Sequence, residues 1–171
     1  MRTLSVLICL PLALLAESAA GLKWTSPAGW KIEPGSRPMR AATYDVPNAS
    51  GDSGSSECVV YFFGAGQGGS IEANLDRWKG QFLSNGQVAK AEIGKRTVHG
   101  LAVSTIESAG DYTGMGGPMA QGTTMNRSYR LLGAIIEGPG GNIFVKFVGP
   151  AKTVASNQKL FDQLIASFAK E

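Results

Sequence analysis

Two pairs of strand-like segments in the second half of the chain are joined by very short turns. Residues 88–98 and 101–112 are separated only by His99-Gly100, and residues 127–137 and 142–148 are joined across a Gly-Pro-Gly-Gly turn. Strands joined so tightly must pair antiparallel, because a parallel pair needs a crossover of about a dozen residues or more. The sequence therefore predicts an antiparallel sheet and argues against a parallel, doubly wound one.

Two further strands are predicted at residues 37–46 and 57–63. The second, with the sequence ECVVYFF, is apolar on both faces, which is typical of a strand in the middle of a sheet. Between these two strands, residues 47–56 are rich in Gly, Ser, Asn and Asp, so we expect a loop there.

Two main helices are predicted, at residues 70–83 and 153–170. In the first, Ile71, Leu75, Trp78 and Phe82 form one apolar stripe at the helical period. Ser70 is expected to cap the first helix and Thr153 the second. Together these elements predict an α+β fold in which helices flank an antiparallel sheet.

The N-terminus, MRTLSVLICLPLALLAESAA, has the three parts of a secretory signal peptide: a basic start, an apolar run and small residues before a cut at Gly21. The alternative, a retained membrane anchor, is disfavoured because the apolar run spans only about 20 Å as a helix, against about 30 Å of hydrocarbon. We therefore predict a signal peptide at residues 1–20, a single domain at residues 21–171, and a secreted or periplasmic protein without a stable membrane anchor.

Charge and cysteine content narrow the function classes. The net charge is only +3 and the basic residues do not cluster, so nucleic-acid binding is not expected. Once the signal peptide is removed, Cys58 is the sole cysteine and cannot form an intramolecular disulfide. Since Cys58 lies in the most apolar predicted strand, we expect a buried, inert thiol.

A glycine-rich segment follows the strand at residues 57–63 and reads Gly64-x-Gly66-x-x-Gly69. The pattern resembles a dinucleotide-binding fingerprint, but that fingerprint belongs to parallel βαβ units, and the later strands here form hairpins. We therefore expect a loop that leads into a helix. The free N–H groups at the helix start could still bind a carboxylate or a phosphate, which makes Gly66, Gln67, Gly69 and Ser70 candidate ligand-binding residues.

Catalytic and metal-binding motifs are sparse. His99 is the only histidine, its hairpin tip offers no partner for a triad, and the carboxylates are scattered, so we predict no catalytic residues and no cofactor. Met115, Met119 and Met125 form one unusual cluster. Thioethers are soft ligands that suit Cu(I), but methionine also fills gaps under flexible loops.

Three segments carry a resemblance to a known group: the opening WTSPAGW, the helical IEANLDRW, and the closing FVGPAKTV with FDQLIASF. The chain resembles the PsbP-like proteins, which share their fold with the Mog proteins. It is also similar to small secreted bacterial proteins of unknown function that carry a GQGGSIEANLDRW-like segment. The resemblance implies an antiparallel sheet flanked by helices, with the C-terminal helix packed on the sheet. It also implies a binding or assembly role and carries over no functional residue.

We therefore expect an exported, non-enzymatic binding or assembly protein whose partner is an unidentified protein or a small ligand. The segments at residues 64–70 and 114–122 are the expected contact surface, because loops held on a rigid sheet commonly carry function. The alternative is an extracytoplasmic copper carrier that uses the methionine cluster. A third class, an enzyme with an unrecognised site, would show a deep pocket holding a titratable group with a perturbed pKa.

Overall fold

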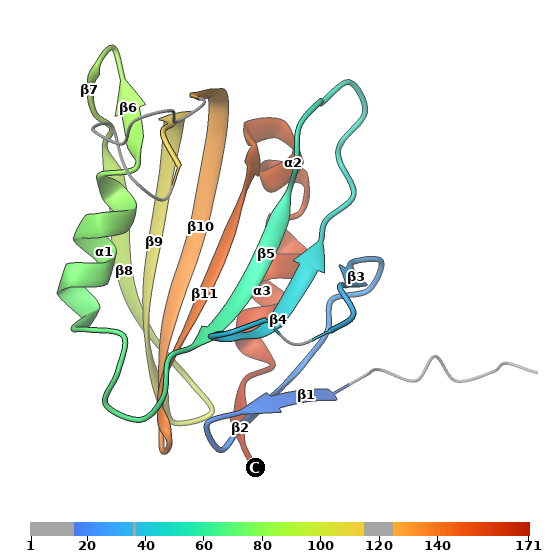
Figure 1. The fold of residues 1–171 in the computed structure, drawn as a ribbon, viewed down its shortest axis with the longest axis vertical. Helices are drawn as coiled ribbons and strands as arrows, with labels where there is room; N and C mark the ends of the chain where they lie inside the picture. The colour runs from blue at the N-terminus through green and yellow to red at the C-terminus, as the bar shows by residue number, and fades with distance from the viewer. Residues whose placement is uncertain (1–15, 36, 115–124) are drawn as a thin grey trace, which may run out of the picture.

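The computed structural model describes residues 16–35, 37–114 and 125–171, and it consists of two sheets and three helices (Figure 1). The strands are β1 (Ala16–Ala19), β2 (Leu22–Thr25), β3 (Lys31–Ile32), β4 (Arg40–Asp45), β5 (Glu57–Phe62), β6 (Phe82–Ser84), β7 (Gln87–Val88), β8 (Ala91–Val98), β9 (Leu101–Tyr112), β10 (Asn126–Gly138), β11 (Gly141–Pro150) and β12 (Ala169–Lys170). The helices are α1 (Ile71–Lys79), α2 (Ala151–Ser156) and α3 (Gln158–Ala166).

The main sheet has the strand order β3-β4-β5-β11-β10-β9-β6-β7, and β8 also pairs with β9. Each pairing between the described strands is antiparallel. The two predicted hairpins are confirmed, since Val98 pairs with Leu101 and Gly138 pairs with Gly141. His99 and Gly100 both have positive φ, as the two central residues of a type I′ turn do, and this turn matches the twist of the flanking strands. The α+β class is therefore confirmed.

One face of the main sheet is covered by α2, α3 and a small sheet of β1, β2 and β12. Its core contains the inward residues of the central strands, including Val60, Val145 and Phe147, together with Phe161 and Ile165 of α3. Cys58 points into this core and is fully buried, as predicted. Burial raises the pKa of the Cys58 thiol well above its ordinary value.

On the opposite face, α1 is the one described helix, and it covers the sheet only in part. Trp78 of α1 lies directly over Gly133 of β10, where an added Cβ would come within 2.7 Å of the indole ring. Leu75 and Trp78 pack with Phe82 and Ile106 in a second core cluster. Figure 1 shows α1 at the β8–β9 side of the sheet, so the surface over β5 and β11 is left without a helix.

Both predicted helices need correction. The first ends at Lys79, and Gly80 forms its C-cap, so Phe82 belongs to β6 and pairs with Tyr112 of β9. The apolar stripe predicted a helix that is too long, because Phe82 is buried as a residue of β6 and not as a residue of the helix. The second predicted helix is divided into α2 and α3 by Asn157, and its last residues form β12.

The predicted cap Thr153 lies inside α2, where its N–H and hydroxyl both donate to Asp52 Oδ2, at 2.9 and 2.6 Å. Two strand predictions also need adjustment. The strand expected at residues 37–46 is shorter, and that at 88–98 is divided between β7 and β8.

The end of the predicted signal peptide forms β1, which pairs with β2 (Ala19 with Leu22). Residues 1–15 of that segment lie outside the described residues. Among the described helices, none has the length and apolar character needed to cross a membrane.

Candidate functional site

A cleft of about 230 Å³ lies on the partly uncovered face, between α1 and the N-terminal end of β4. Its walls come from four elements that are distant in sequence: β4, β5, α1 and β11. The lining residues are Pro38, Met39, Arg40, Tyr61, Phe63, Arg77, Trp78, Gln81, Phe144 and Lys146. A smaller hollow of about 60 Å³ adjoins it and shares Arg40, Tyr61 and Lys146. We call the two together the Lys146 cleft.

Lys146 is a buried cation in the middle of β11, with a residue exposure of 5%. Its strand neighbours are Val59 of β5 and Gly133 of β10. The ammonium Nζ donates to the amide oxygen of Gln81, at 2.6 Å, and to the hydroxyl of Tyr112, at 3.4 Å. It also lies 5.3 Å from the centre of the Tyr112 ring. Both hydrogen-bond partners are neutral, and the described residues provide no ion pair to Lys146.

Burial and, to a smaller extent, the charge of Arg77 together lower the pKa of Lys146 from 10.5 to about 7, while Glu57 opposes both effects. The cause is physical: an ammonium removed from water without a counter-ion favours its neutral form. The neighbouring Tyr112 has its pKa raised to about 12, mainly by burial, so its hydroxyl keeps its proton. The cleft therefore presents an amine that changes charge near neutral pH beside a hydroxyl that does not.

The partner Gln81 is anchored through its backbone. Its backbone carbonyl accepts two hydrogen bonds from Thr113, one from the N–H at 2.9 Å and one from the hydroxyl at 3.1 Å. Gln81 itself is buried, immediately after the Gly80 cap of α1. These bonds hold the backbone of the residue whose side-chain oxygen accepts from the Lys146 ammonium.

Two arginines line the rim of the cleft. Arg40 donates to Glu57 at 3.2 Å and stacks over the Tyr61 ring at 5.5 Å. Arg77 donates to the side-chain oxygen of Asn74 at 2.5 Å. The cleft and its adjoining hollow thus combine three cationic side chains with one acid, Glu57, which Arg40 already holds. The local charge favours an anion.

The other wall of the cleft is aromatic. Tyr61 and Phe63 stack with ring centres 5.8 Å apart, and Phe63 meets Phe144 edge-on at 5.3 Å. Phe144 and Lys146 are two residues apart on one strand and so face the same side of the sheet. The aromatic wall therefore adjoins the Lys146 ammonium directly.

Met39 closes the rim with an unusual backbone. It has a φ of 65°, and its carbonyl accepts a hydrogen bond from the Phe62 N–H at 3.0 Å. Its side chain is 62% exposed, although the residue is large and apolar. Strained backbone of this kind is concentrated at functional sites, which agrees with the position of Met39 at the rim.

The glycine-rich segment lies outside the lining of the cleft. Gly66, Gln67, Gly69 and Ser70 are all exposed. Ser70 caps α1 as predicted, its hydroxyl accepting from the Ala73 N–H at 3.1 Å. The contact with the cleft comes instead from Gly68, where an added Cβ would lie within 3.0 Å of the rings of Phe63 and Phe144.

The methionine cluster is placed only in part. Met115 and Met119 lie outside the described residues, and Met125 is 49% exposed just before β10. The strand ends that flank this segment, Tyr112 and Asn126, pair with each other. That end of the sheet lies opposite the β10–β11 turn, where Gly141 meets the glycine-rich segment. Copper binding by the methionines stays a prediction.

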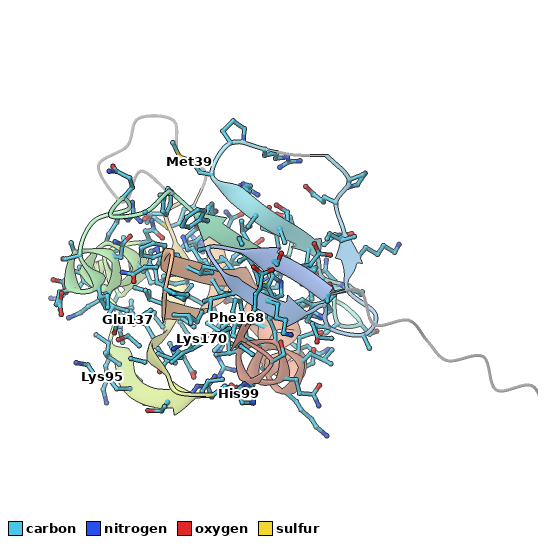
Figure 2. All side chains as sticks on the ribbon, turned by 90° about the horizontal axis from the view of Figure 1, so that it is seen from below. Met39, Lys95, His99, Glu137, Phe168 and Lys170 are labelled. Carbon is cyan, nitrogen blue, oxygen red and sulfur yellow. The ribbon has the colours of Figure 1, made fainter. Side chains whose placement is uncertain are left out.

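His99 sits at the exposed tip of the β8–β9 hairpin, as expected, and its Nδ1 lies 2.9 Å from the carbonyl oxygen of Phe168 (Figure 2). This contact joins the β8–β9 hairpin to the C-terminal segment. In the parts of the chain that the structure describes, no group of three or more His, Cys, Asp or Glu side chains could hold a metal ion.

Sequence reasoning missed Lys146, Arg40 and Tyr61. The available signal was a lone lysine in the otherwise apolar stretch IFVKFV of a central strand. Lysine is almost never fully buried without a partner, so a charge at such a position points to a site.

Comparison of the sequence with protein families and with curated proteins finds no match. Solved structures do match. One is CyanoP, the cyanobacterial PsbP of Synechocystis, with a TM-score of 0.50 and 14% identity over 98% of each chain. The chain has a PsbP-like fold. This match confirms the resemblance that the sequence predicted. At 14% identity it concerns the fold alone.

A second structure that resembles this PsbP-like chain is PA94 of Pseudomonas aeruginosa, a protein of unknown function. Its TM-score is 0.49 at 12% identity, covering 92% of this chain and 97% of that one.

Proposed function

We propose that this PsbP-like chain is an exported, non-enzymatic binding protein, and that the Lys146 cleft holds a small organic anion with an aromatic or apolar body. The observation that carries the proposal is Lys146 itself, a buried ammonium whose direct partners, Gln81 and Tyr112, are both neutral. A buried charge without a counter-ion costs the folded state several kcal/mol. Proteins retain such a charge where it has a function.

An anion in the cleft would remove this cost. A carboxylate near Nζ would restore the protonated lysine and accept a charge-assisted hydrogen bond, which is shorter and stronger than a neutral one. Arg40 and Arg77 line the same cleft and add to the attraction. The binding energy would therefore come mainly from electrostatic complementarity in a partly desolvated site.

The aromatic wall selects the rest of the ligand. Phe63, Phe144 and Trp78 offer ring faces and edges within one cleft, and ring pairs contribute about 0.5–1.5 kcal/mol beyond their buried area. The cleft of about 230 Å³ is below the usual range for drug-sized ligands. A single-ring carboxylate is of the right size and chemistry.

The experiment uses benzoate, phenylacetate and indole-3-acetate as probes, with the matching neutral amides as controls. Binding is followed by calorimetry at pH 6, where Lys146 is protonated. We expect at least one carboxylate to bind and its amide to bind at least tenfold more weakly. Lys146→Met should weaken carboxylate binding at least tenfold, whereas the exposed Lys95→Met should leave it unchanged. Equal binding of acid and amide, or no binding of any probe at millimolar concentration, contradicts the proposal.

One observation favours a second function. An amine whose pKa is lowered to about 7 is also what a nucleophilic lysine requires. The Lys146 amine could add to the carbonyl carbon of an aldehyde, with loss of water and formation of an imine. Incubation with 4-carboxybenzaldehyde and cyanoborohydride, followed by mass spectrometry, separates the two functions. A reduced adduct at Lys146 supports imine chemistry, and its absence together with carboxylate binding supports a binding site alone.

A further inference from the structure

β8 is an edge strand that the other described residues leave uncovered. It pairs with β9 along one side, and the six residues Glu92 to Thr97 are all exposed, so both of its faces meet solvent. Ile93 is 52% exposed, which is high for a large apolar side chain in a strand. Figure 2 shows Lys95 on β8 projecting away from the body of the molecule. An uncovered edge of this length is a template for pairing with another strand.

Hollows lie on both sides of β8. One, of about 340 Å³, separates it from α3, and the other, of about 530 Å³, separates it from the start of α1. Apart from the Arg96 side chain, which extends to α3, these hollows leave the free edge of β8 open to a strand from another chain.

The charges on β8 are unbalanced within one chain. Glu92 pairs directly with Glu107 of β9, and like charges opposite each other destabilise a sheet. Glu107 is already held by Arg130, at 2.7 Å, and the described residues offer Glu92 no ion pair. On the same face, the Arg96 guanidinium forms a long ion pair with the Asp162 carboxylate of α3, with an N–O distance of 3.7 Å. Both side chains therefore have capacity for a further opposite charge.

We propose that β8 pairs antiparallel with β8 of a second copy of this chain, about a two-fold axis at Gly94, which joins the two main sheets into one. In this register Glu92 of each copy lies opposite Arg96 of the other, giving two symmetric ion pairs. Ile93 lies opposite Lys95, whose aliphatic stem can cover it.

Other registers are poorer. The two-fold axis keeps the faces of the joined sheets in common, so paired residues must lie on the same face of β8. A shift by one step toward the N-terminus sets Lys90 against Arg96, and a shift toward the C-terminus sets Lys95 against its own copy. Of these three registers, only the axis at Gly94 pairs opposite charges twice.

The dimer is expected to be weak, because one pair of short strands buries less surface than a standard protein interface. The Lys146 cleft lies on the far side of α1 from β8, so this proposal stands or fails independently of ligand binding.

Sedimentation velocity from about 10 µM to about 500 µM tests the proposal, a range suited to a small, weak interface. The wild-type chain is expected to shift toward a dimer, and Glu92→Arg alone or Arg96→Glu alone should weaken the dimer at least tenfold. The double variant Glu92→Arg/Arg96→Glu restores opposite charges and should recover dimerisation to near the wild-type value. Circular dichroism and urea unfolding of each variant show whether it remains folded.

A wild-type chain that stays monomeric throughout this range overturns the proposal. A dimer that both single variants leave intact overturns it as well, because the contact would then lie elsewhere. Failure of the charge-swapped double variant to dimerise, while it remains folded, excludes the register at Gly94.

Discussion

Replacing Lys146 by methionine is expected to stabilise the protein at acidic pH and to abolish part of its pH dependence. Methionine is unbranched and close in length to lysine, so it fills the same space in β11 without a charge. The two Lys146 hydrogen bonds, to Gln81 and Tyr112, are lost in exchange. The net effect depends on which of the two terms is larger.

The magnitude follows from the pKa of Lys146, which lies at about 7 in the folded chain and at 10.5 when unperturbed. Each pKa unit corresponds to about 1.4 kcal/mol, so the buried ammonium costs the folded state about 5 kcal/mol below pH 7. Losing its hydrogen bonds leaves the Gln81 amide oxygen unsatisfied, at a cost of about 1–3 kcal/mol. At pH 6 the variant should therefore be more stable by about 2–4 kcal/mol.

The gain must fade as the pH rises. Because the folded pKa is the lower one, the unfolded chain binds more protons between pH 7 and 10.5, and wild-type stability rises across that window. The Lys146→Met variant has no ammonium at this position, so its stability should not rise in this way between pH 7 and 10.5. Its advantage should shrink by about 4 kcal/mol between pH 6 and pH 10, so that at pH 10 the variant should lie between equal stability and about 2 kcal/mol below wild type.

The assay is urea unfolding followed by tryptophan fluorescence at pH 6, 8 and 10, with Lys95→Met as the control. Lys95 is exposed on β8, so its replacement should change the free energy of unfolding by less than about 0.5 kcal/mol at each pH. A Lys146→Met variant that is less stable than wild type at pH 6 refutes the reasoning. So does a difference in stability that is the same at pH 6 and pH 10.

Three further perturbations test other parts of the structure. Gly133→Ala places a Cβ within 2.7 Å of the Trp78 ring and should destabilise the protein by about 1–3 kcal/mol in urea unfolding; an unchanged midpoint would mean that α1 does not pack as described. Asp52→Ala removes the acceptor of both Thr153 hydrogen bonds at the start of α2 and should cost about 1–3 kcal/mol, with a neutral result excluding that contact. The Cys58 thiol, fully buried and with a raised pKa, should react with a thiol reagent only as fast as the chain unfolds, and rapid labelling of the native protein would contradict its position in the core.

The sheet could be predicted from the sequence because its strongest determinants are local. The His99-Gly100 and Pro139-Gly140 turns bring neighbouring strands together, and no distant residue is needed to specify an antiparallel pairing. The order of the distant strands, with β5 beside β11, depends on burial across the whole sheet and leaves no comparable local mark.

The helix boundaries were predicted less well because tertiary contacts decide them. Phe82 fits the apolar stripe of α1 in sequence, yet it pairs with Tyr112 in the sheet. A buried Phe82 fits both an extension of α1 and a strand, so the periodicity of apolar residues alone cannot distinguish the two.

The Lys146 cleft could not be predicted because its parts meet only in the folded chain. Arg40, Trp78 and Lys146 come from three separate elements, and no motif links them. The glycine-rich segment was predicted as a site because it resembles a known motif. In the structure it leads the chain into α1, and its Gly68 packs against Phe144.

The most direct test of the account is the titration of Lys146 itself by NMR, using lysine labelled with ¹³C at Cε and the Lys146→Met variant to assign its signal. We predict an apparent pKa near 7 in the free protein, against an ordinary value of 10.5, and a rise in that pKa when phenylacetate is added. A signal that titrates near 10.5 would show that Lys146 is not a buried, uncompensated cation. A pKa that phenylacetate leaves unmoved would show that the cleft does not receive the anion.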